Sequence, residues 1–194
     1  MAFMMKTAQV TANAAVLSYW SGVSRDGFGF ILNNTANKLL AQGYASSGSP
    51  KVNLLSSSSV NDGNWHSIAF NYNRNNGGAN ALFVDGSQEA TGNSASAGWV
   101  GGHSNIWIAA GDNPDTFWAS YVGEIAEIGH WTVNLDASEI AALAKGFGPK
   151  LIRPASLIFH APVVRETGER KAGLAANITG GGVSDHCRVI GGAV

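Results

Sequence analysis

The segment Val60–Gly86 constrains the fold more than any other part of the chain. It reads as a turn, a strand, a glycine-rich hairpin loop at Asn75–Gly78 and a second strand that ends in a tight Asp-Gly turn. Ile68, Phe70 and Tyr72 share one face at a spacing of two, which is the side-chain period of a β-strand. Such a hairpin is half of a sandwich sheet. The segment therefore predicts the architecture better than it predicts an activity.

Two motifs resemble laminin-G-like, concanavalin-A-like jelly-roll domains. Residues 62–66, Asp-Gly-Asn-Trp-His, resemble the D-G-x-W-H strand of these domains, and residues 84–86 resemble their V-D-G turn. Residues 121–146 resemble their closing G-x-I-x-E strand and the short helix after it. The resemblance covers residues 3–146 and implies a fold shared by lectins, pentraxins, adhesion modules, some glycosidases and virion proteins. A fold of this kind does not by itself imply a function.

Composition agrees with an all-β, two-sheet antiparallel β-sandwich (a jelly roll) that has one short helix and an extended C-terminal arm. The chain has 194 residues, 45% hydrophobic and only 13% charged, with 25 glycines, which suits short strands joined by glycine turns. A net charge of −1 gives no case for nucleic acid or an acidic membrane as the main partner. The single cysteine, Cys187, excludes an intrachain disulfide. We see no secretory signal and no apolar run long enough to span a membrane.

Strand patterns and turn signals recur along most of the chain, as in a sandwich of two antiparallel sheets. The run Ser56–Ser59 is interpreted as a polar loop. The expected strands are residues 3–11, 15–21, 27–33, 38–45, 51–56, 65–73, 81–85, 105–110, 121–132 and 155–161.

One helix is well signalled. Asp136 can cap its N-terminus, Glu139 three residues later completes a capping box, and Gly146 suits its C-terminal end. Ile140 and Leu143 give the helix one apolar face to lay against the sandwich.

The chain changes character near residue 150, so we divide it into a sandwich at 1–149 and a C-terminal strand with a basic, Gly-rich arm at 150–194. The arm has six Lys or Arg and three acidic residues, a charge of +3, which leaves −4 for the rest. Two readings stay open. The arm completes the sandwich, replacing strands that the family has before residue 3, or it contacts a neighbouring subunit, since an unfilled sheet edge accepts strands from another chain. The candidate intersubunit residues are Arg165, Arg170, Lys171 and Arg188.

Catalysis has little support in the sequence. Glycosidases on this fold place their carboxylates at i, i+2 and i+4 of one strand, whereas Glu124 and Glu127 are three apart. In a regular strand this spacing puts them on opposite faces, where they cannot form an acid and nucleophile pair about 5 Å apart. By the resemblance, Glu127 occupies a structural acidic position. No G-x-S-x-G motif accompanies the serines and histidines. We therefore expect no enzymatic activity.

The histidines and the cysteine show no metal-binding spacing, and His66 is expected to be structural. Calcium is the one cofactor considered. Asp112, Asn113 and Asp115 form an oxygen-rich loop of the kind that holds Ca²⁺ at the rim of related domains, although the same residues suit an ordinary Asx turn. No other cofactor is expected.

Trp99 and Trp118 fall in loop-like contexts. They are candidates for stacking against a sugar or for anchoring an interface. The tryptophans in expected strands, which we assign to packing, are Trp20, Trp65, Trp107 and Trp131.

Two hypotheses for the function follow. The first is a non-catalytic structural protein of a bacteriophage virion, such as a capsid, decoration or tail component, assembled in the host cytoplasm as a homo-oligomer with other virion subunits. The missing signal peptide, the absence of disulfides and the basic arm support it. The alternative is an extracellular, lectin-like module that binds surface glycans, which the fold resemblance and the loop tryptophans support. Neither involves a membrane or nucleic acid.

Overall fold

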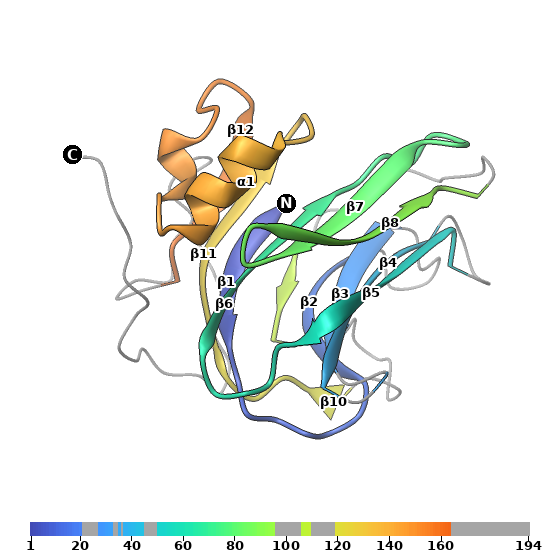
Figure 1. The fold of residues 1–194 in the computed structure, drawn as a ribbon, viewed down its shortest axis with the longest axis vertical. Helices are drawn as coiled ribbons and strands as arrows, with labels where there is room; N and C mark the ends of the chain where they lie inside the picture. Colours follow the sequence, from blue (N-terminus) through green and yellow to red (C-terminus); the bar gives the residue numbers. More distant parts are fainter. Residues whose placement is uncertain are drawn as a thin grey trace.

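The computed structural model describes residues 1–20, 27–32, 35, 37–44, 50–95, 106–109 and 119–163, without the side chain at position 20. Two β-sheets lie face to face, and one short helix packs outside them (Figure 1). The predicted two-sheet β-sandwich with one short helix is therefore confirmed.

The first sheet, sheet A, has six antiparallel strands. Their order is β12 (Leu157–Ala161), β11 (Glu124–Trp131), β1 (Ala2–Lys6), β6 (Trp65–Asn71), β7 (Ala79–Val84) and β8 (Ser87–Asn93). The second, sheet B, has the order β10 (Ala119–Ser120), β2 (Ala14–Trp20), β3 (Gly27–Leu32), β4 (Lys38–Tyr44) and β5 (Val52–Ser59), and β9 (Trp107–Ile108) also pairs with β2. The pairing of β10 with β2 is parallel, and the other pairings in this sheet are antiparallel.

Aromatic rings fill the space between the sheets. Phe3 and Phe30 meet edge to face at 4.8 Å between ring centroids, and Phe30 meets Phe70 at 5.8 Å. Tyr72 stacks on Phe70 at 5.3 Å. Ile68 and Phe70 are fully buried in this core and Tyr72 packs against it, as their alternation predicts. Edge-to-face and offset contacts of this kind add to the stabilisation that burial gives.

A second, smaller core lies between sheet A and α1 (Ala137–Ala144). The predicted capping box is confirmed, because the side chain of Asp136 accepts from the N–H of Glu139, and that of Glu139 accepts from the N–H of Asp136. Gly146, with φ of 91°, ends the helix as predicted. The short 3-10 helix η1 (Pro149–Leu151) follows. Trp131 lies in this core and donates from Nε1 to the carbonyl of Ile152 at 2.7 Å.

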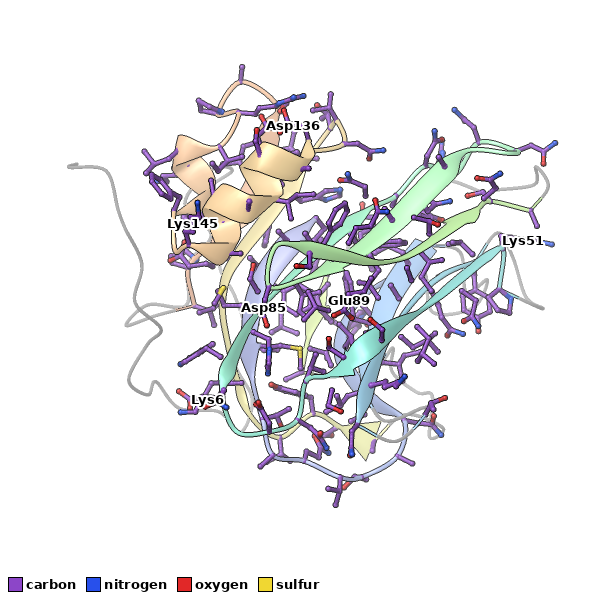
Figure 2. All side chains as sticks on the ribbon, viewed as in Figure 1. Lys6, Lys51, Asp85, Glu89, Asp136 and Lys145 are labelled. Atoms are coloured by element: carbon purple, nitrogen blue, oxygen red, sulfur yellow. The ribbon has the colours of Figure 1, made fainter. Side chains whose placement is uncertain are left out.

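The interpretation of Ser56–Ser59 as a loop is wrong, because these residues form the end of β5. The backbone of Ser57 and Ser58 is held by a side chain that is distant in the sequence. Glu89 on β8 accepts from the N–H groups of Ser57 and Ser58 at 2.9 and 3.0 Å, so the edge of sheet B is tied to the edge of sheet A. Figure 2 shows Glu89 at this seam. Strand β8 was not predicted, because as an edge strand it carries mostly exposed or half-exposed polar residues and no alternation of apolar residues.

The strand around Leu157 belongs to sheet A of the same chain. In β12, His160 lies opposite Gly129 and Ala161 lies opposite Ile128 of β11. The roles of residues after 163, and hence the division at residue 149, stay predictions because those residues lie outside the described part of the chain.

Candidate functional site

The nine side chains that the sequence marks as candidates all lie outside the described residues. They are the loop tryptophans Trp99 and Trp118, the calcium candidates Asp112, Asn113 and Asp115, and the arm residues Arg165, Arg170, Lys171 and Arg188. Their roles stay predictions, and the candidate site below comes from other residues.

Each of the seven carboxylate side chains in the described ranges has a structural partner. The pairs are Glu124 with Lys6, Glu127 with His160, Asp62 and Asp85 with His66, Asp136 and Glu139 with Arg153, and Glu89 with the N–H groups of Ser57 and Ser58. A catalytic carboxylate needs an open approach to a substrate. These carboxylates are instead committed to holding the fold.

The spacing argument for Glu124 and Glu127 needs a correction. It assumes a regular strand, but β11 bulges against β1, and Glu127 has φ of 51°. Alternation of faces therefore does not hold across this stretch. The two acids differ instead in their partners, since Glu124 lies 2.8 Å from Lys6 Nζ and Glu127 lies 3.0 Å from His160 Nε2.

His66 lies between two carboxylates, those of Asp62 and Asp85. Its Nδ1 lies 2.8 Å from Asp85 Oδ2 and its Nε2 lies 3.0 Å from Asp62 Oδ1. The hydrogen bond with Asp85 is the main cause that raises the pKa of His66 to about 9, against the opposing effect of burial. The imidazolium is charged at neutral pH and donates from both nitrogens. It therefore joins the turn at Asp62 to the turn at Asp85, which Figure 2 labels, and cannot act as a general base.

The outer face of sheet B carries a polar row, but the row is closed to solvent over most of its length. Trp107, Ser18, Gly29, Gln42 and Asn53 lie opposite one another across five strands. Gln42 Nε2 donates to Asn53 Oδ1 at 2.7 Å. Ser18 is 1% exposed and Gln42 8%, so the middle of the row is closed, while Asn53 at one end is exposed and Trp107 at the other is partly exposed.

An accessible polar surface lies at one end of the sandwich, where connections from both sheets meet. Asn61 Nδ2 donates to the carbonyl of Gln9 at 3.1 Å and to Asn37 Oδ1 at 3.0 Å. Gln9 Nε2 donates to the carbonyl of Ser120 at 3.0 Å, and its Oε1 accepts from the N–H of Val122 at 2.7 Å. These side chains hold the β1–β2, β5–β6 and β10–β11 connections together at the lower end of Figure 1.

The same surface exposes two large apolar side chains. Val10 is 80% exposed and Val122 is 69% exposed, and Gln9 connects their segments. Asn13 in the β1–β2 connection and Asn37 just before β4 adopt left-handed backbone, with φ of 56° and 66°. We call this surface the rim cluster and define it as Gln9, Val10, Asn37, Asn61, Ser120 and Val122. Sequence reasoning missed it because each asparagine suits an ordinary turn when taken alone.

Neither a metal centre nor a membrane span is found in the described part. No group of three or more His, Cys, Asp or Glu side chains there is arranged to hold a metal ion. None of the helices described is long and apolar enough to cross a bilayer.

Solved structures with the same fold come from proteins of very different sequence. A Bacteroides ovatus protein provisionally described as carbohydrate binding aligns with a TM-score of 0.62 at 14% identity, over 88% of this chain. The alignment covers 48% of that protein, so this chain spans about half of its length. The heptameric SAP-like pentraxin of Limulus polyphemus aligns with a TM-score of 0.56 at 13% identity, over 74% of this chain and 67% of the pentraxin.

No curated protein sequence matches the chain. A protein-family match, in contrast, covers residues 1–141, well over half of the sequence, and its description agrees with the two-sheet architecture. On this match, the chain belongs to the Concanavalin A-like lectin/glucanases superfamily.

Proposed function

We propose that the protein is a non-catalytic carbohydrate-binding module that holds glycan at the rim cluster. The observation that carries the proposal is the rim cluster itself, in which partly exposed amide side chains are fixed by hydrogen bonds next to the exposed valines Val10 and Val122. The similarity of this fold to that of the Bacteroides ovatus protein, which is provisionally described as carbohydrate binding, supports the proposal. These comparisons favour glycan binding over the virion component that composition suggests.

The chemistry of the rim cluster suits a sugar. Each hydroxyl of a sugar both donates and accepts a hydrogen bond, and so does an amide side chain. The exposed methyl groups of Val10 and Val122 can cover the C–H face of a pyranose ring. Gln9 and Asn61 are already ordered by their hydrogen bonds, so binding costs little further side-chain entropy.

The partners of the described acids support the non-catalytic part of the proposal. In the described chain, every carboxylate is bound to a cation, a histidine or backbone N–H groups. An exposed surface without converging acids among the described residues suits reversible binding, with a dissociation constant of about 0.1–1 mM for one site.

A glycan array on the full chain, followed by calorimetry with the best ligand, tests the proposal. Val10→Asp should weaken binding at least about tenfold, which is about 1.4 kcal/mol, because it places a charge against the sugar face. Val133→Asp is the matched control, since Val133 is also exposed, at 44%, but follows β11 outside the rim cluster. Binding to no glycan below about 10 mM would refute the function. Binding that Val10→Asp leaves unchanged but Trp99→Ala abolishes would move the site to the loop.

A further inference from the structure

Trp65, at the start of β6, is a large aromatic side chain that the two described cores do not account for. Trp131 is buried in the core under α1, as its place in a strand predicts. Trp65 belongs to neither core and is partly exposed. Its indole Nε1 has no hydrogen-bond partner among the described residues, and it is not one of their buried unbonded atoms. The indole therefore presents both a ring and a donor to solvent.

Strand geometry places Trp65 on the outer face of sheet A. Ala69 of the same strand lies in the core under α1, while Ile68 faces the other sheet. Trp65 is four residues before Ala69 in a regular stretch of strand, so the two side chains share a face. Lys6 on β1 lies directly opposite Trp65, and residues directly opposite each other also share a face. Trp65 and Lys6 therefore lie together on the part of this face that the core under α1 does not reach.

A partly exposed ion pair continues this surface. Lys6 lies directly opposite Glu124 on β11 as well, and its Nζ is 2.8 Å from Glu124 Oε1, with the two side chains 38% and 26% exposed. Figure 2 labels Lys6 near the lower end of sheet A. An ammonium group has three N–H donors, and among the described residues this one contacts only Glu124. We call Trp65, Lys6 and Glu124 the outer row.

The outer row borders the rim cluster. Thr7 follows Lys6, and its hydroxyl donates to the carbonyl of Val122 at 2.6 Å and accepts from the N–H of Gln9 at 2.9 Å. Gln9 is three residues from Lys6, and Val122 is two residues from Glu124, so each connection spans at most about 11 Å. A chain of sugar units held at the rim cluster therefore reaches the outer row.

We propose that the outer row is a second sugar subsite, which takes a further neutral pyranose unit of the glycan bound at the rim cluster; this inference rests on the proposed function. The indole ring covers the C–H face of the sugar, and its Nε1 and the ammonium of Lys6 donate to hydroxyl oxygens. Glu124 orients and neutralises the ammonium, so an acidic sugar would meet a like charge beside the cation. The ligand is accordingly an oligosaccharide of neutral units rather than a single sugar or an acidic polysaccharide.

Calorimetry of the full chain with a series of one to six neutral units, taken from the best ligand of the glycan array, tests the subsite. The dissociation constant should fall at least about tenfold from one unit to the longest oligosaccharide. Trp65→Ala should abolish this gain and leave the affinity for one unit unchanged, while Trp65→Phe, which keeps a ring, should retain most of it. Lys6→Met, which keeps the alkyl stem, should reduce the gain at least about threefold. Trp107→Ala is the matched control, since Trp107 is also partly exposed but lies on β9 of sheet B, and it should keep the gain.

A gain that survives both Trp65→Ala and Lys6→Met would overturn the subsite, and so would equal affinity for one unit and for six. A Trp65→Ala chain that loses affinity equally for the shortest and the longest ligand would give Trp65 a structural role only, and would also overturn it. Tighter binding of an acidic oligosaccharide of the same length would contradict the neutral ligand. Binding without any dependence on length leaves the proposed function standing, whereas binding to no glycan refutes both.

Discussion

The contact of His66 with Asp62 and Asp85 should make the stability of the fold depend on pH in a predictable direction. The pKa of His66 is raised from 6.5 to about 9, so the unfolded chain releases this proton more readily than the folded one. The stabilisation is fully present below pH 6.5 and is lost as the pH rises through about 9. On the acid side, the hydrogen bonds from Asn64 are the main cause that lowers the pKa of Asp62 to about 2. The contribution of Asp62 is present above about pH 3.8 and is lost as the pH falls toward 2.

The raised pKa sets an upper bound on the contribution of His66 to the free energy of unfolding. The difference between about 9 and 6.5 corresponds to about 3.4 kcal/mol at 1.36 kcal/mol per pH unit, if all of it acts on folding. The side chains of Asp62 and Asp85 are 47% and 52% exposed, so water screens much of the attraction. We therefore expect about 1–2 kcal/mol, or a few degrees in the midpoint of thermal unfolding for a chain of this length.

Urea unfolding of the natural sequence and of His66→Gln, at several pH values from 5.5 to 10, measures this contribution. Subtracting the free energies of unfolding of the two chains cancels the contributions of titratable groups that both chains contain. The difference in the free energy of unfolding should be about 1–2 kcal/mol larger at pH 6 than at pH 10. A difference that stays constant across this range, or a His66 that titrates near 6.5 by NMR, would refute the reasoning.

Three further perturbations test the packing. Gly86→Ala should lower the free energy of unfolding in urea by about 2–3 kcal/mol, because Gly86 has φ of 82° and an added Cβ would lie 3.2–3.3 Å from atoms of α1. The control is Gly63→Ala, which has the same φ and no atom within 4 Å of an added Cβ, so it should show the backbone cost of about 1 kcal/mol alone. Equal losses would mean that the contact with the helix is unimportant. Glu89→Gln should cost about 1 kcal/mol and speed hydrogen exchange at the Ser57 amide, and unchanged exchange would contradict the seam. Trp131→Phe should cost about 2–3 kcal/mol in thermal unfolding, because it leaves a buried carbonyl without its donor and removes ring volume, and a loss below 0.5 kcal/mol would contradict this packing.

Local patterns made the fold predictable. The spacing of Ile68, Phe70 and Tyr72 follows from strand geometry within a few residues, and the capping box between Asp136 and Glu139 spans a single helical turn. Both signals are complete inside a short window of sequence. For this reason the expected strands and the helix agree with the described structure apart from their ends, the loop expected at the end of β5, and the strands β8 and β10, which were not expected.

The rim cluster and the end of β5 could not be predicted in this way, because their partners are distant in sequence. Asn61 bonds to the carbonyl of Gln9, 52 residues away, and Ser57 bonds to Glu89, 32 residues away. A serine or an asparagine looks the same in a sequence whether it lies in a turn or binds such a partner. Only the pairing of the sheets decides which contacts exist, and that pairing depends on the whole chain.

The small core beneath α1 has a practical consequence for anyone who expresses this chain in pieces. The family match ends at residue 141, inside the helix, yet Ile152 and Leu157 fill the same core as Trp131. A clone that ends with the match would cut the helix in half, remove residues that pack against the Trp131 indole and delete the last described strand, β12. We expect such a fragment to be recovered mainly in inclusion bodies. A reading frame that continues through at least residue 163 retains every described residue of this core.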